Sequence, residues 1–406
     1  MNTFLAEPFL RGERLLLKSG WWLQNETHPE EMNKIINAYG EVVENLNQHV
    51  NPNSPYDSAE KLLSLVTLGL STYGRAALHE PLSEGAKRII LALQESQEPL
   101  FIAGWGEQIH SLRHAGELRS RIRLYTISDQ DDTGPWIRAH FLDIFYVVSI
   151  YAWNAYHSGK MWDIPRWVSL CKLITLVQNP WLDANIRLGP LGSLYPQVVF
   201  GMEGDTPSFL LLIQNGLGYR DRIYWGSWGG RYSRSLALVD WAGGIDTNHF
   251  VDSYSTPQAS IWRWRTAYQD DFAARMQWTL TSNFSKVGHP PVLNINGQQG
   301  PDPLIVQVKS NETYTFDAGL TLDPDNPTDN SHLEFQWVLY RESTMFQANV
   351  SLKALEPPVG SNGVLDINDA GFTNATLGIK VQVTVPQPLR NIYTGTSPGF
   401  HIILHQ

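Results

Sequence analysis

Residues 121–136 read RIRLYTISDQDDTGPW, and this stretch decides the fold. Its first seven residues resemble a buried strand, and the three carboxylates of Asp129, Asp131 and Asp132 follow at once. We call these three residues the first acid loop. A threonine and a proline come next, which is typical of a helix start because Asp or Thr caps the first turn and proline fits inside it. Residues 144–150 are again apolar, so the stretch predicts a β-α-β unit and a parallel sheet.

A second segment repeats this order. Residues 197–202 are apolar and strand-like, and Glu203 and Asp205, the second acid loop, precede a threonine and a proline. Ligands of open parallel sheets bind beyond the carboxyl ends of the strands. If residues 121–127 and 197–202 are neighbouring parallel strands, the two acid loops share one edge. Such carboxylates hold Ca²⁺ or Mg²⁺, or act as general acid and base on a glycosidic bond. The alternative is that each Asp-Thr pair caps a helix and the other acids are solvated.

Aromatic residues supply further candidates. Residues 225–232 read WGSWGGRY, in which Trp225 and Trp228 offer faces to a sugar and Arg231 offers hydrogen bonds. Glycines between them let the backbone approach a ligand closely. Asn154 follows the strand-like run 144–150 and presents an amide to a substrate hydroxyl. The alternatives are an aromatic turn packed on the domain's own surface and an ordinary turn asparagine.

The length of 406 residues predicts two domains. Up to residue 287, strand-like runs, including 99–103, alternate with helical patterns at 30–43, 58–68 and 258–280, which predicts an α/β domain. A Pro-Pro pair at 290–291 is a stiff linker. Residues 288–406 then predict an all-β sandwich. Its short alternating runs are 292–295, 304–308, 314–317, 333–340, 377–385 and 400–404.

Composition and charge limit the partners and metal sites that this protein can have. A net charge of -10 argues against a nucleic-acid partner. Cys171 is the only cysteine, which leaves no intramolecular disulfide and no thiolate metal site. No apolar run approaches the ~18 residues of a membrane span, so no membrane partner is expected. Five Asn-x-Ser/Thr sequons, at 25, 283, 311, 349 and 374, favour a secreted protein, although residues 1–14 are a poor signal peptide.

Several strings resemble the sucrose-hydrolase-like proteins, often labelled cellulose-binding proteins, of bacteria and fungi. They are YTISDQDDTGPWIR at 125–138, GPLG at 189–192, MEGDTPSFL at 202–210, WGSWGGRY at 225–232, IWRWR at 261–265 and DFAARM at 271–276. The resemblance covers most of residues 21–290. It implies a nucleoside-hydrolase-like α/β domain, a cadherin-like or Ig-like sandwich, a Ca²⁺ cofactor and hydrolysis of a glycosidic or N-glycosyl bond outside the cell.

The chain also departs from that family. Its members open on a strand and an acidic cluster that supplies the main calcium ligands and the general base, and residues 1–20 lack such a cluster. The resemblance therefore leaves Asp205 as the surviving metal ligand, with the first acid loop as catalytic acids and with Asn154, Glu203 and the 225–232 residues on the substrate. We predict a hydrolase of small carbohydrates or nucleosides that is weakened or inactive in this chain. The alternative is a non-catalytic carbohydrate-binding protein.

Overall fold

The structure is a computed structural model that describes most of the chain. The described residues are 29–104, 109–129, 131–150, 152, 156, 174–199, 202–219, 222–235, 240–243, 246–248, 254–300, 302, 304–307, 312–329, 331–340, 350–355, 362–367, 377–384 and 396–405. Within them, no helix is long and apolar enough to cross a membrane.

Five strands form the central sheet in the order β1-β2-β3-β5-β4. They are β1 (Leu100–Gly104), β2 (Ile122–Thr126), β3 (Phe145–Val148), β4 (Tyr232–Ser235) and β5 (Asp240–Gly243). The first three and β5 run parallel, whereas β4 pairs antiparallel with β5 at the edge. All of β1 is buried, as expected for a parallel sheet covered on both faces. The predicted strands at 99–103, 121–127 and 144–150 are confirmed.

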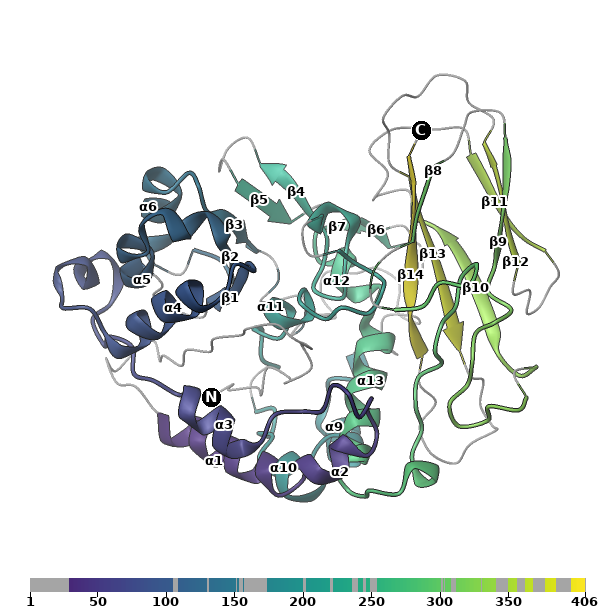
Figure 1. Ribbon diagram of the computed structural model, residues 1–406, viewed down its shortest axis with the longest axis horizontal. Helices are drawn as coiled ribbons and strands as arrows, with labels where there is room; N and C mark the ends of the chain where they lie inside the picture. Colours follow the sequence, from purple (N-terminus) through teal and green to yellow (C-terminus); the bar gives the residue numbers. More distant parts are fainter. Residues whose placement is uncertain are drawn as a thin grey trace.

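The helices among the described residues are α1 (Pro29–Gly40), α2 (Val43–Asn47), α3 (Ala59–Leu65), α4 (Glu84–Glu95), α5 (Ile109–His114), α6 (Thr133–His140), α9 (Asn179–Asn185), α10 (Gly189–Gly192), α11 (Pro207–Leu210), α12 (Ala259–Trp262) and α13 (Arg265–Trp278), with short 3₁₀ turns η1 (Gly74–His79), η2 (Gly116–Arg121), η3 (Ile223–Trp225) and η4 (Phe284–Lys286). Helices α4, α5 and α6 lie beside strands β1 to β3, and α1, α2, α3, α9 and α10 form a separate group below them in the view of Figure 1. Because α6 connects the parallel strands β2 and β3, the predicted β-α-β unit is confirmed.

The predicted long helix at 258–280 is instead two helices. Trp264 leaves the helical conformation at φ −104°, ψ 2° and separates α12 from α13. Its amide nitrogen bonds the carbonyl of Ile261 at 3.1 Å, the short spacing of a 3₁₀ turn. The break directs Arg263 onto Tyr340, with 4.2 Å from the guanidinium carbon to the ring centre. The helical spacing of apolar residues in the sequence runs through residues 263–264 without a break, so it gave no sign of this turn. The turn brings residues 263–264 against Tyr340 of the C-terminal part.

The predicted strand at 197–202 is wrong for the residues of it that the structure describes. Residues 197–199 and 202 lie outside any strand, and the neighbour of β3 on that side is β5. The Asn179 side chain binds both backbone groups of Val198, accepting from its amide and donating to its carbonyl, each at 2.9 Å. An apolar run whose backbone is satisfied in this way needs no strand partner.

The C-terminal strands pair in two further sheets. One has the order β10-β13-β14-β8 and the other β11-β12-β9. The strands are β8 (Leu304–Gln307), β9 (Thr313–Asp317), β10 (Glu334–Leu339), β11 (Val350–Leu355), β12 (Asn362–Ile367), β13 (Leu377–Thr384) and β14 (Thr396–His405), and a separate hairpin joins β6 (Asp246–Asn248) to β7 (Tyr254–Thr256). Of the predicted runs, 292–295 forms only isolated bridges. The Ig-like sandwich and the domain boundary at 287/288 stay predictions.

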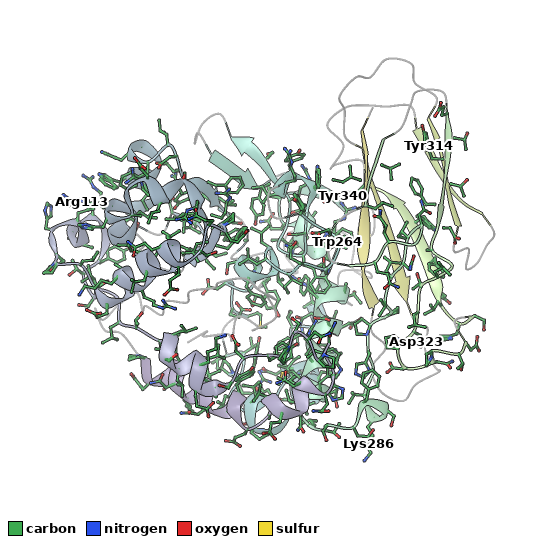
Figure 2. The ribbon with its side chains drawn as sticks, in the orientation of Figure 1. Arg113, Trp264, Lys286, Tyr314, Asp323 and Tyr340 are labelled. Carbon is green, nitrogen blue, oxygen red and sulfur yellow. The ribbon has the colours of Figure 1, made fainter. Side chains whose placement is uncertain are left out.

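Trp264 and Tyr340 meet between the α/β part and these strands (Figure 2). Their rings pack edge to face with centres 6.1 Å apart. Gly226 (φ +83°) lies against the same tyrosine ring, where a Cβ would fall about 3.0 Å from a ring carbon. Two requirements therefore call for glycine at position 226: a positive φ and a close approach of the backbone to the Tyr340 ring.

Candidate functional site

Asp129 of the first acid loop is held by an arginine. Arg138 of α6 donates to both carboxylate oxygens, at 2.7 and 2.6 Å. The arginine side chain is 7% exposed and that of Asp129 is 27% exposed, so the pair is largely shielded from water. Gly134 makes room for it, since a Cβ there would collide with the carboxylate. A two-point pair of this kind fixes the orientation of the carboxylate as well as its charge.

The other two acids of this loop bind backbone. Asp131 accepts from the amide of Thr133 at 2.8 Å and from its hydroxyl, which forms an Asx turn just before α6. Asp132 accepts from the amide of Arg75 at 2.9 Å and so ties the loop to η1. All three carboxylates of the first acid loop therefore have structural partners. The predicted capping of α6 by the Asp-Thr pair is wrong, because the N-cap residue Asp132 makes no capping bond with its side chain.

Glu203 of the second acid loop is almost completely buried. Its Oε2 accepts from the amides of Asp205 at 2.8 Å and Thr206 at 3.1 Å, and its Oε1 is bonded by the Thr206 hydroxyl. No cation balances it among these contacts. Burial raises its pKa to about 7, and the charge of Asp205 adds to this rise against the lowering effect of the hydrogen bonds. Burial also raises the pKa of Asp205.

Tyrosine hydroxyls lie around this carboxyl group. Burial raises the pKa of Tyr195, and the charge of Glu203 raises it further. Burial also raises the pKa of Tyr156, and the charges of Tyr195 and Glu203 add to that rise. The Tyr156 hydroxyl donates to Gln269 Oε1 at 2.7 Å, and the buried Arg265 reaches the Tyr156 carbonyl at 3.3 Å. The group is a buried polar network inside the main core cluster.

Trp228 borders a small enclosed cavity beside this network. The cavity has a volume of about 40 Å³, and its lining includes Tyr156, Thr206, Trp228, Tyr268 and Gln269. The Trp228 ring nitrogen is buried and has no hydrogen-bond partner among the described residues. The rest of its lining is largely apolar, with Phe209, Leu210, Ile213 and Phe272, and a cavity of this size is too small for a sugar ring.

The structure places the predicted substrate contacts as follows. Trp225 and Trp228 are 3% and 2% exposed, so their faces pack against protein. Trp225 lies against Tyr219, with ring centres 5.7 Å apart. Arg231 is half-buried, and Asn154 lies outside the described residues. Glu203 and Asp205 adjoin each other. Since the described residues 197–199 and 202 lie outside the sheet, the predicted placement of the two acid loops on neighbouring strands is wrong for these residues. The roles of the candidate site residues stay predictions.

The sequence did not identify Arg138, Arg265 or Gln269, which orient the acids and tyrosines described above. Arg138 and Arg265 lie within strings that carry the family resemblance, whereas Gln269 lies in none of them.

The residues described by the structure do not fit the calcium site that the resemblance implies. Among them, no group of three or more His, Cys, Asp or Glu side chains lies close enough to hold a metal ion. Asp205 has only Glu203 as a carboxylate neighbour, and the oxygens of Glu203 already accept three hydrogen bonds. Calcium takes six to eight oxygen ligands, which is more than these two carboxylates supply.

Fold and site together define an α/β protein of the nucleoside-hydrolase-like class. A family model described as "Cellulose-binding Sde182, nucleoside hydrolase-like domain" matches residues 10–232, and the chain belongs to this family. A solved structure of a nucleoside hydrolase-related hypothetical protein from Saccharophagus degradans, described as associated with carbohydrate metabolism, superposes with a TM-score of 0.77. It is 22% identical, over 99% of this chain and 95% of that chain, and supports the fold. A search of curated proteins found no match.

Proposed function

We propose that this protein binds carbohydrate on a nucleoside-hydrolase-like scaffold and that its first acid loop is structural rather than catalytic. The observation that carries the proposal is the Asp129–Arg138 pair, in which both carboxylate oxygens accept from one guanidinium. The guanidinium occupies both oxygens and fixes the orientation of the carboxylate, which leaves neither oxygen free to hold an attacking water. Asp131 and Asp132 are likewise bound to backbone amides.

The family's cellulose-binding description supports a glucan as the ligand class. Arg231, in the loop that precedes β4, is the predicted contact best suited to a test, because it is half-buried whereas Trp225 and Trp228 are core residues. Truncating either tryptophan would damage the fold as well as any site. We expect Arg231→Ala to weaken glucan binding about tenfold, or about 1.4 kcal/mol, with little change in the melting temperature.

The experiment measures binding and turnover on the same preparation. Retention on cellulose and calorimetric titration with cello-oligosaccharides report binding. Release of free sugar from nucleosides and disaccharides, with added Ca²⁺ and with a chelator, reports hydrolysis. The proposal expects saturable binding without sugar release. Sugar release that depends on Asp129 or Asp131 would overturn it.

A second function, hydrolysis through the second acid loop, is favoured by one observation. Glu203 is a buried carboxyl group with a pKa of about 7, beside the tyrosine hydroxyls, and such a group is able to exchange a proton near neutral pH. If sugar is released, Glu203→Gln distinguishes the two acid loops. Loss of turnover with retained binding in that variant would assign the chemistry to Glu203.

A further inference from the structure

Two buried histidines and an aspartate connect three distant segments. His49 follows α2, His289 precedes the C-terminal strands, and Asp325 lies in the loop between β9 and β10. His49 Nδ1 lies 3.0 Å from His289 Nε2, and His289 Nδ1 lies 2.6 Å from Asp325 Oδ1. At the far end, His49 Nε2 lies 2.7 Å from the carbonyl oxygen of Thr281. The His289 amide also donates to Asp325 Oδ2 at 2.7 Å.

The acceptor atoms at the two ends of this series of hydrogen bonds, from Thr281 to Asp325, determine how many ring protons the two histidines share. A carbonyl oxygen only accepts, so His49 Nε2 carries a proton and donates to Thr281. An ionised carboxylate also only accepts, so His289 Nδ1 carries a second proton. The bond between the two rings needs a third. Two neutral imidazoles carry only two ring protons, and complete bonding therefore requires one imidazolium beside the Asp325 carboxylate.

The surroundings indicate which ring carries the charge. Burial lowers the pKa of His49, and the neighbouring His289 lowers it further against the raising effect of the Thr281 carbonyl. His289 has the carboxylate, so the imidazolium is His289. Trp278 stacks on both rings at 5.6 and 5.2 Å, and Phe284 stacks on His289 at 3.6 Å. These contacts exclude water from the bonds.

Further charged groups lie on both sides of the two rings. On α13, Arg275 lies over the Trp278 ring, 5.1 Å from its centre, and pairs with Asp271 at 2.7 Å. Asp323 accepts from the Asp325 amide at 2.9 Å and pairs with His332 at 2.8 Å. From the α13 side, the contacts to the two rings come from the uncharged Trp278, Phe284 and Thr281. From the α2 side, the neutral Asn45 donates to the Thr279 carbonyl at 2.9 Å. Asp325 is therefore the charged group in direct contact with the two imidazoles.

We propose that His49, His289 and Asp325 form a proton-dependent clasp that joins the α/β part to the C-terminal strands. The clasp is fully bonded with three shared ring protons. Losing one proton sets the lone pairs of two ring nitrogens against each other at 3.0 Å. Gaining a proton either places N–H groups on both facing nitrogens, His49 Nδ1 and His289 Nε2, or neutralises the Asp325 carboxylate. In either direction one of the three bonds is lost, and the attachment of residues 288–292 to α2 and α13 weakens.

Nitrogen-15 spectra of the histidine rings test the proton count in the intact wild-type protein. Near neutral pH we expect His289 to be protonated on both ring nitrogens and His49 on Nε2 alone, with assignments from His49→Asn and His289→Gln. At higher pH the His289 signals should change to those of a neutral ring as hydrogen exchange of residues 288–292 accelerates. A His289 that is neutral at neutral pH in the folded protein would overturn the proposal.

Thermal unfolding as a function of pH gives an independent readout. We expect the alkaline fall in melting temperature to begin about one pH unit lower in Asp325→Asn, because the anion that holds the third proton is gone. His332→Asn is the matched control, since it removes a neighbouring His–Asp pair that has no second imidazole. Its alkaline fall should match that of wild type. An unchanged fall in Asp325→Asn, or an equal shift in the control, would contradict the clasp.

Discussion

The two acid loops share a sequence order and differ in how their charges are compensated. In the first, Asp129 is neutralised by Arg138 and keeps partial contact with water. In the second, Glu203 is buried and receives only neutral donors. Hydrogen bonds from amides stabilise a carboxylate, but here desolvation outweighs them and the pKa rises to about 7. The difference shows that acid content alone does not identify a reactive carboxyl group.

The comparison also separates position from reactivity. The first acid loop follows a strand of the parallel sheet, at the edge where ligands of such folds bind, yet each of its carboxylates has a structural partner. The second follows no strand among the residues that the structure describes, yet its glutamate lies among buried tyrosines beside a small cavity. The position of ligand sites in parallel sheets therefore favours the first acid loop as the site, whereas the raised pKa of Glu203 favours the second.

Removing the cation from the first acid loop should have the largest effect. Arg138→Met leaves the Asp129 carboxylate half-enclosed without its counter-ion, and we expect the free energy of unfolding to fall by about 3 kcal/mol. Denaturant titration measures this. Lys61→Met is the control, because the Lys61–Asp57 pair is exposed and its loss should cost less than about 1 kcal/mol. Equal losses in the two variants would mean that the Asp129–Arg138 pair does not hold its loop.

The second acid loop should give an effect of similar size that, unlike the first, depends on pH. The pKa of Glu203 is raised in the folded protein from 4.5 to about 7, so the unfolded chain releases its proton first as pH rises. Wild type therefore loses stability between these values, and the loss is complete above pH 7. Glu203→Gln cannot ionise. It should match wild type near pH 4.5 and exceed its free energy of unfolding by about 3 kcal/mol at pH 8.

Unfolding curves of both proteins at several pH values check this. Glu117→Gln, at an exposed position in η2, controls for the loss of one carboxylate from the chain. Its difference from wild type should stay flat across the same range. A flat difference for Glu203→Gln as well would show that Glu203 is ionised in the folded protein at low pH, and the contrast between the acid loops would disappear.

The sequence predicted the parts of the fold that depend on local order. Strands β1, β2 and β3 and the start of α6 were found because apolar runs and turn residues act within a few positions. The run at 197–202 failed because its backbone is bound by Asn179, almost twenty residues earlier. Strands β11 and β12 were missed because residues 350–367 include a lysine, a glutamate and several glycines and prolines that weaken the alternation.

The candidate site was predicted less completely, for a related reason. The acids could be named from the sequence, but their reactivity depends on partners that folding brings to them. Asp129 pairs with Arg138, which lies in the helix that directly follows it. The tyrosines around Glu203 come from farther away, from Tyr156, 47 residues before it, to Tyr268, 65 residues after it. The desolvation that raises the Glu203 pKa is a property of the assembled core and has no local signal.

The Asx turn of Asp131 provides the smallest test of the comparison. Asp131→Ala removes the acceptor for the Thr133 amide and should lower the free energy of unfolding by about 1 kcal/mol. Asp131→Asn keeps an acceptor oxygen and should cost only a few tenths of that amount. Because the role is structural, glucan binding should be the same in both variants. If the two variants were equally stable but Asp131→Asn lost sugar binding or release, the charge of Asp131 would serve a ligand, and the first acid loop would be the reactive one.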